Sequence, residues 1–260
     1  MSEVLTPRPA STILTLRDGA NGVEVLLLRR NLNSDFVGGA YVFPGGAVDA
    51  EDGAFEGRVT GVDDRIASER LELPGGGLAY YVAALRELFE EAGLLVSTRP
   101  DGAPTEVSVG ALERWRDELN SRRCSFTDVL DALGHVLDLR GVAYLSHWVT
   151  PVGQPRRFDT RFFVVEAPSG QIAGHDEGET VAHRWMRPSD ALAAAASGTL
   201  TMILPTIRNL ESIADFARVA DVLAWVGSSR TVTRVDPQMV ERDGRRVILL
   251  PGDEGYEDLD

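Results

Sequence analysis

Three glutamates lie close together on one predicted helix. The segment Leu78–Ala92 carries an apolar stripe at helical spacing, and Glu87, Glu90 and Glu91 fall on the opposite side, within about 100° of one another. Carboxylates at this spacing converge, which is electrostatically costly unless a cation lies between them. Oxygen ligands suit Mg²⁺ or Mn²⁺. The three glutamates alone leave one alternative open, the hydrated acidic face of a surface helix.

The residues around these glutamates narrow the interpretation. The run Arg86–Leu94 reads RELFEEAGL, and upstream lies the turn Phe43-Pro44-Gly45-Gly46, which can bring a backbone carbonyl close to a metal. Together the two segments resemble the Nudix box, so the chain is similar to the Nudix hydrolase superfamily. This resemblance implies an α+β fold, an α/β/α sandwich with a mixed central sheet, and an enzyme that hydrolyses a pyrophosphate bond.

The box is interrupted. The family pattern runs G-x5-E-x7-REUxEExGU, where U is a bulky apolar residue, and counting from Gly46 places Asp52 at its first acidic position. An unbroken box would put the arginine at position 60, but it stands at 86, which implies 26 inserted residues. An interrupted box resembles the Nudix subgroup that includes the mammalian peroxisomal coenzyme A diphosphatase. The resemblance therefore favours coenzyme A or an acyl derivative as substrate, with 3′,5′-ADP and a 4′-phosphopantetheine as products.

A second signature of coenzyme A diphosphatases, LLTxR[SA]x3Rx3Gx3FPGG, is only partly present. The chain supplies Leu26, Leu27, Arg30 and Gly39, but it lacks the threonine, the small residue and the inner arginine of the pattern. ADP-ribose or NADH is therefore an alternative substrate. A non-catalytic Nudix fold that senses a ligand is an alternative of a different class, although the retention of all three helix glutamates favours an enzyme.

The resemblance also implies roles for the residues of the box. Glu87, Glu90 and Glu91 would hold the divalent cations together with the carbonyl of Gly45, and Glu87 would also orient or deprotonate the attacking water. Arg86 would orient Glu87 through a charge-assisted hydrogen bond rather than touch the substrate.

Three further acids have open roles. Asp52 fits a place in the site and a place on the surface equally well, because the insertion can put its loop anywhere. In this superfamily the general base sometimes comes from a later loop, where Glu177 and Glu179 are the candidates. A hydrated loop acid is the alternative for both.

Arginine is the expected phosphate ligand, because the 260 residues contain no lysine. Guanidinium groups suit bidentate phosphate contacts. The candidates for substrate binding are Arg30, Arg156, Arg157 and Arg161, and pairing with the protein's excess acid is the alternative reading.

The rest of the chain predicts one domain over residues 1–260. We expect strands at Thr12–Leu16, Val23–Arg29 and Thr180–Met186 among others. Three additions are expected: a box insertion at about 53–77, a helical insert at about 100–140 and a C-terminal extension at about 205–260. A helix over Pro205–Val226 carries an apolar stripe, which predicts packing on the core or on a homodimer mate.

Composition excludes several classes of protein. The absence of lysine excludes lysine-containing phosphate loops and Schiff-base enzymes, and the single cysteine, Cys124, excludes a disulfide scaffold. With 40 acidic and 26 basic residues the net charge is -14, which argues against binding nucleic acid. No apolar run approaches twenty residues, so we expect no membrane partner and a cytoplasmic location. The resemblance to Nudix hydrolases implies a small nucleotide-type substrate.

Overall fold

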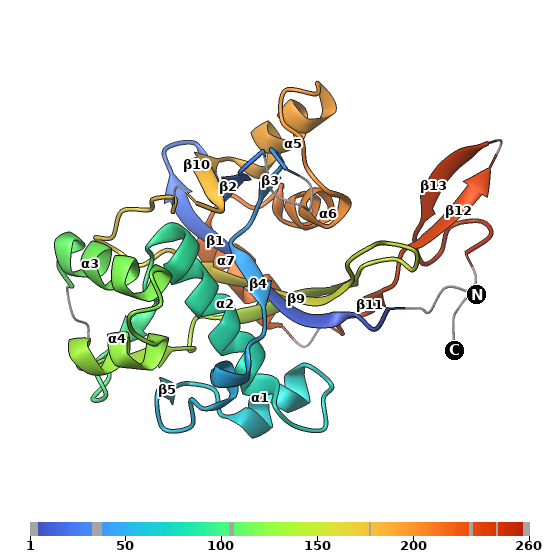
Figure 1. Ribbon diagram of the computed structural model, residues 1–260. Helices are drawn as coiled ribbons and strands as arrows, with labels where there is room; N and C mark the ends of the chain where they lie inside the picture. The colour runs from blue at the N-terminus through green and yellow to red at the C-terminus, as the bar shows by residue number, and fades with distance from the viewer. Residues whose placement is uncertain are drawn as a thin grey trace.

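The computed structural model describes residues 5–32, 38–103, 107–176, 178–228, 231–242 and 244–256. Its centre is a mixed sheet in the order β10-β2-β1-β9-β8-β11, to which β3 and β4 add at the edges of β2 and β1 (Figure 1). The strands of this sheet are β1 (Arg8–Gly19), β2 (Gly22–Arg30), β3 (Tyr41–Val42), β4 (Gly45–Ala47), β8 (Ala143–Val149), β9 (Phe158–Glu166), β10 (Thr180–Met186) and β11 (Arg234–Val235). The first two predicted strands lie within β1 and β2, which pair antiparallel as a hairpin, and β10 has the predicted bounds.

Helices cover both faces of the sheet, as an α/β/α sandwich requires (Figure 1). On one face Ile13 and Phe163 pack against α2 (Gly77–Ala92), α3 (Val109–Asn120) and α4 (Phe126–Leu133). On the other face the core contains residues of α5 (Pro188–Ala196), α6 (Leu204–Ile213) and α7 (Val219–Gly227). Alternate side chains of β1 and β9 enter the two cores, which explains why these strands are apolar on both sides.

The box insertion is compact rather than an open loop. It follows the 3-10 turn η1 (Ala50–Gly53) and contains the strand β5 (Val59–Thr60) and the helix α1 (Asp64–Arg70). Strand β5 joins β7 (Val136–Asp138) and β6 (Ser97–Thr98) in a small separate sheet, so the insertion and the helical insert fold against each other.

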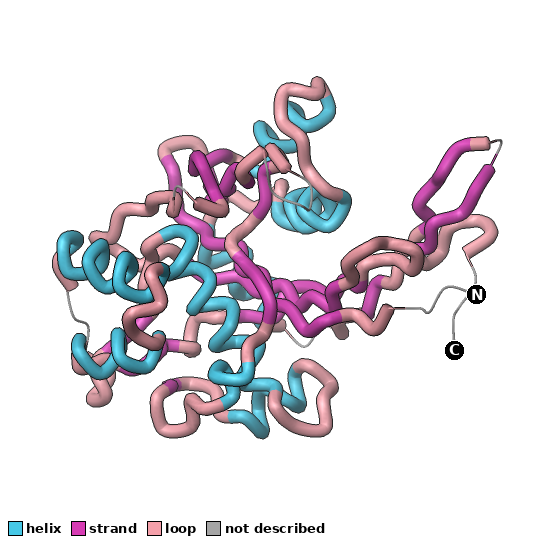
Figure 2. Tube along the Cα trace, in the orientation of Figure 1, coloured by secondary structure: helices cyan, strands magenta, loops and turns pink. Residues whose placement is uncertain are grey.

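The C-terminal extension has two parts. The helix predicted over Pro205–Val226 is divided into α6 and α7, and both contribute buried residues to the core. Beyond them β12 (Gln238–Arg242) and β13 (Arg245–Leu249) form a hairpin that projects from the body of the protein (Figures 1 and 2). Among the described residues, no helix is long and apolar enough to span a membrane.

Candidate active site

Helix α2 carries the predicted site, and the two inserts hold its two ends. At the N-terminus, Asp64 of α1 accepts hydrogen bonds from the N–H groups of Gly76 and Leu78 at 3.1 and 2.9 Å. At the C-terminus, Arg116 of α3 donates to the carbonyls of Glu90 and Glu91. An anion at the start of a helix and a cation at its end complement the free backbone groups and the helix dipole. Nothing in the sequence pattern pointed to Asp64 or Arg116, because both contacts cross between separate elements.

Arg86 is the centre of a buried ion-pair network. Its Nε and Nη2 donate to the two carboxylate oxygens of Asp52 at 2.9 and 3.0 Å, and Nη1 donates to Glu87 at 2.8 Å and Glu90 at 3.2 Å. Burial alone would lower the pKa of Arg86, but its hydrogen bond to Asp52 and the charges of its acidic neighbours raise the pKa overall. Arg86 thus contacts Glu87 as predicted, and Asp52 is neither a surface residue nor a free acid, since it is 1% exposed and paired.

The turn Phe43–Gly46 lies directly against the helix glutamates. The N–H of Gly45 donates to Glu91 at 3.1 Å, and a Cβ on Gly46 would sit 2.5 Å from Oε1 of Glu87, so a larger residue there would displace the Glu87 carboxylate. Burial raises the pKa of Glu87 to about 7, and burial together with the charges of Glu87 and Glu179 raises the pKa of Glu91 well above its usual range. The site therefore concentrates carboxylates that repel one another when ionised.

The carboxylates of Glu87, Glu90 and Glu91 are chemically suited to bind a divalent cation. The donors are all oxygens, the carboxylates are partly or fully withdrawn from water, and a positive charge would relieve their mutual repulsion. Over the described residues, no three His, Cys, Asp or Glu side chains already stand in the arrangement of metal ligands. Glu87 and Glu90 each accept a hydrogen bond from Arg86 through one carboxylate oxygen, so a cation would be held through the other oxygen of each.

A cavity of about 690 Å³ opens beside the glutamates. Glu87, Gly45 and Gly46 lie in its wall together with Glu179 and Arg30. Thus two acids from separate parts of the chain, one of the helix and one of the loop before β10, face the same space. This volume is in the range of small-molecule binding sites.

The loop before β10 is held in place by its neighbours. Arg30 donates to Oε1 of Glu179 at 2.9 Å, and the N–H of Asn31 donates to the Glu179 carbonyl at 2.8 Å. Asp176 accepts from the N–H groups of Glu179 and Thr180 at 3.0 and 2.7 Å. Glu179 is thereby placed at the cavity, while the other candidate base, Glu177, lies outside the described residues.

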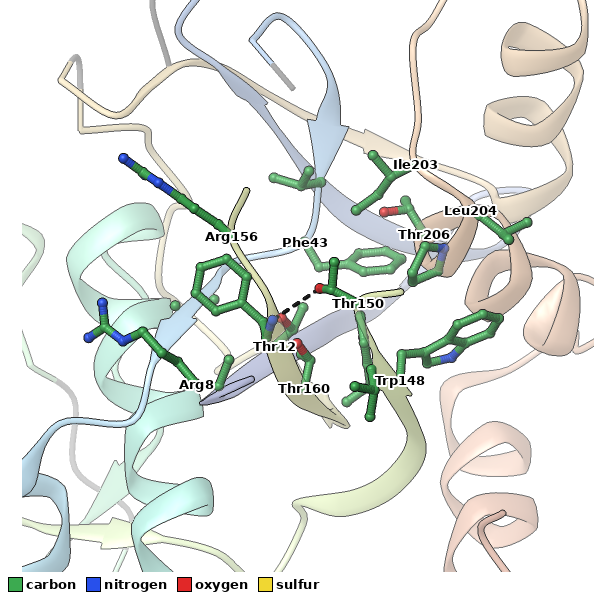
Figure 3. A pocket seen from close by; sticks show the side chains of 18 of the residues that line it. Arg8, Thr12, Phe43, Trp148, Thr150, Arg156, Thr160, Ile203, Leu204 and Thr206 are labelled. Carbon is green, nitrogen blue, oxygen red and sulfur yellow. Dashed lines mark hydrogen bonds between the residues drawn. The ribbon is translucent and has the colours of Figure 1, made fainter. Parts of the chain in front are cut away.

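The structure separates the four candidate arginines into two pairs. Arg30 and Arg156 line the cavity, and so does Arg8, which sequence reasoning missed. In Figure 3, Arg8 and Arg156 lie on the same side of the cavity. Arg157 is not in the described wall of the cavity and donates to the carbonyl of Thr150.

Arg161, like Arg157, does not line the described cavity, contrary to its prediction as a substrate-binding residue. Strand alternation puts Thr160 and Phe162 in the cavity wall and turns Arg161 to the opposite face of β9. There its guanidinium pairs with Asp159 and lies 4.6 Å from the ring centre of Tyr80. Arg161 is 5% exposed and serves the packing of α2 on the sheet rather than substrate binding.

Comparison with known proteins agrees with this geometry. The family model described as the NUDT19 Nudix domain matches residues 59–213, more than half of the chain. The chain belongs to the NUDT19 family of Nudix hydrolases. Divalent metal is a general requirement of Nudix hydrolases, which gives the cluster on α2 its interpretation as a metal site.

Relatives of this Nudix hydrolase extend over most of its length. Acyl-coenzyme A diphosphatase NUDT19 of Homo sapiens is 30% identical, over 93% of this chain and 74% of the relative, and the protein of that name from Gallus gallus is 29% identical over 91% and 74%. Among solved structures, a Nudix hydrolase from Alicyclobacillus acidocaldarius is 29% identical and superposes with a TM-score of 0.68, covering 88% of this chain and 97% of that one.

Proposed function

We propose that this Nudix hydrolase cleaves the pyrophosphate bond of coenzyme A or an acyl-coenzyme A, with Mg²⁺ or Mn²⁺ as its metal. The products would be 3′,5′-ADP and 4′-phosphopantetheine or its acylated form. The observation that carries the proposal is the single cavity in which Glu87, Glu179 and Arg30 share a wall with a largely apolar surface. Such a cavity suits a pyrophosphate that joins a charged nucleotide to a long uncharged arm. The names of the mammalian and avian relatives support the same substrate class.

The chemistry assigned to each residue follows from its position. Glu87, Glu90 and Glu91 would hold the cation, with the turn at Gly45 against them. When bound, the cation neutralises pyrophosphate charge and lowers the pKa of water. Glu179 would take a proton from the attacking water as general base. The water oxygen bonds to one phosphorus, and the bridging oxygen leaves with the other phosphate, so that one water is consumed for each bond broken.

The product profile tests the proposal. Coenzyme A, ADP-ribose and NADH are supplied at equal concentration, with Mg²⁺ and with Mn²⁺ separately, and the products are separated by chromatography. We expect 3′,5′-ADP from coenzyme A at a rate well above the release of AMP from the other two. If ADP-ribose or NADH turns over while coenzyme A is untouched, the proposed substrate is wrong and the alternative Nudix pyrophosphatase activity is correct.

A further inference from the structure

The cavity has an extended apolar region that cleavage of a pyrophosphate does not itself require. Six of the side chains that line it are Trp148, Phe162, Ile203, Leu204, Pro237 and Ile248. In Figure 3, Trp148, Ile203 and Leu204 lie across the cavity from the two labelled arginines. Apolar surface left open to water in a cavity gains free energy when an apolar ligand covers it.

Part of this wall comes from the C-terminal extension. Pro237 and Ile248 lie beyond residue 213, where the match to the family domain ends. The strand β11 pairs in parallel with His147–Trp148 and so places Pro237 beside the cavity, in whose wall it lies. The following hairpin is fixed at its base, because Gln154 donates to the sulfur of Met239 at 3.2 Å.

Strand alternation in β13 gives one side chain to the cavity and turns its neighbour away. Ile248 lines the cavity, whereas Val247 is not part of the described wall. Both are open to solvent, at 45% and 37% exposure, and belong to the same two-stranded hairpin. A difference between variants at these two positions therefore reports contact with the ligand rather than general stability of the hairpin.

The apolar side chains that line the cavity suit one part of the proposed substrate better than the others. Adenine carries ring nitrogens and an amino group that need hydrogen-bond partners, and the 3′-phosphate needs cations such as Arg8 or Arg156. Leu204, Pro237 and Ile248 offer aliphatic carbon to the cavity instead. An acyl chain on the thiol end of coenzyme A has no polar group to satisfy and gains from each methylene that it buries.

We propose that the C-terminal hairpin is a specificity element, with Ile248 as its contact residue, that binds the acyl chain of an acyl-coenzyme A and favours the thioester over the free coenzyme. The proposal rests on the proposed function for the location of the pyrophosphate. It assigns a use to a part of the chain that lies outside the matched family domain.

The test compares coenzyme A, acetyl-coenzyme A and octanoyl-coenzyme A with the wild type, Ile248→Ser and the matched control Val247→Ser. Each methylene buried is worth about fourfold in affinity. We expect Ile248→Ser to lower kcat/KM for octanoyl-coenzyme A about tenfold while leaving free coenzyme A within about twofold. Val247→Ser should leave all three substrates unchanged.

Binding is measured in parallel by calorimetry on the metal-free protein, which separates the two proposals. An equal loss for all three compounds in Ile248→Ser, or equal effects at positions 247 and 248, overturns the acyl-chain site. If the wild type hydrolyses coenzyme A but shows no preference for chain length, this inference fails and the proposed function stands. If affinity rises with chain length through Ile248 but no compound is hydrolysed, the acyl site stands and the proposed function fails.

Discussion

Arg86 and Asp52 form a bidentate ion pair across the interruption of the Nudix box. The two side chains are 34 positions apart, and Nε and Nη2 of the arginine lie 2.9 and 3.0 Å from the two oxygens of the aspartate. The same guanidinium contacts Glu87, so the placement of a metal-binding carboxylate depends on a residue on the far side of the insertion. The insertion thus separates the box in sequence without separating it in space.

Breaking this pair should cost stability. Asp52→Ala leaves Arg86 buried without its bidentate partner, and we expect the free energy of unfolding to fall by about 3–5 kcal/mol in urea titrations. Glu51→Ala is the control, because Glu51 is exposed in the same 3-10 turn, and it should change stability by less than about 0.5 kcal/mol. If both substitutions change the free energy of unfolding equally, the Arg86–Asp52 pair does not contribute the predicted stability.

Removal of one carboxylate from α2 should abolish most of the activity. Glu91→Gln keeps the size of the buried side chain but loses the charge that a cation requires, so we expect turnover to fall at least about 100-fold. Circular dichroism should show an unchanged fold. Glu113→Gln, on the exposed side of α3, is the matched control and should remain fully active. Retained turnover in Glu91→Gln would refute the assigned site.

The metal-free protein should lose stability as the pH rises through neutrality. Burial raises the pKa of Glu87 to about 7 from an ordinary value of 4.5, so its contribution is complete below 4.5 and is lost as the pH passes about 7. In EDTA, the free energy of unfolding of the wild type relative to Glu87→Gln should fall by about 2 kcal/mol between pH 5.5 and 8. Added Mg²⁺ should stabilise the wild type more at pH 8, because the cation competes with protons. A flat difference between the two proteins would contradict the raised pKa.

Glu179 should behave as a general base rather than as a structural residue. Glu179→Gln removes a general base and should lower kcat by about 10²–10⁴-fold with little change in KM. The backbone of Glu179 accepts a hydrogen bond from the N–H of Asn31 and donates one to Asp176. Neither bond involves the substituted carboxylate, so both should preserve the loop. An effect on KM alone would indicate substrate binding instead.

Substitution by glutamine should have different effects at Arg30, which lines the cavity, and at Arg161, which is buried in the core. Arg30→Gln removes a charged donor from the cavity wall and should raise KM about tenfold. Arg161→Gln should leave KM nearly unchanged and lower the free energy of unfolding by about 3 kcal/mol, since it leaves Asp159 without its arginine. Steady-state kinetics and urea unfolding on both variants distinguish the two roles.

Local patterns in the sequence were sufficient to predict the catalytic helix and much of the sheet. The apolar stripe of α2 and its end at Gly93, which has a φ of 71°, depend on neighbouring residues alone. The pairing of Arg86 with Asp52 and the partners of Arg161 were not predictable in the same way. Whether a charge faces a cavity or the core depends on strand register between distant segments, and that register placed Arg161 on the inner face. The contacts of Asp64 and Arg116 with the ends of α2 likewise depend on how the inserts fold back.

The parallel pairing of β1 with β9 has a consequence for how the protein folds. Arg8 lies opposite Phe158, so the two central strands bring together residues that are 150 positions apart in the chain. Pairings of such long range fold slowly, because the chain must close a large loop before the contact gives any gain. Until then, the apolar edge of β1 has no partner strand on that side and is open to association with other chains. We therefore expect refolding from urea to be slow and concentration-sensitive, with the cavity, whose wall includes Thr12 and Thr160 of these two strands, among the last features to form.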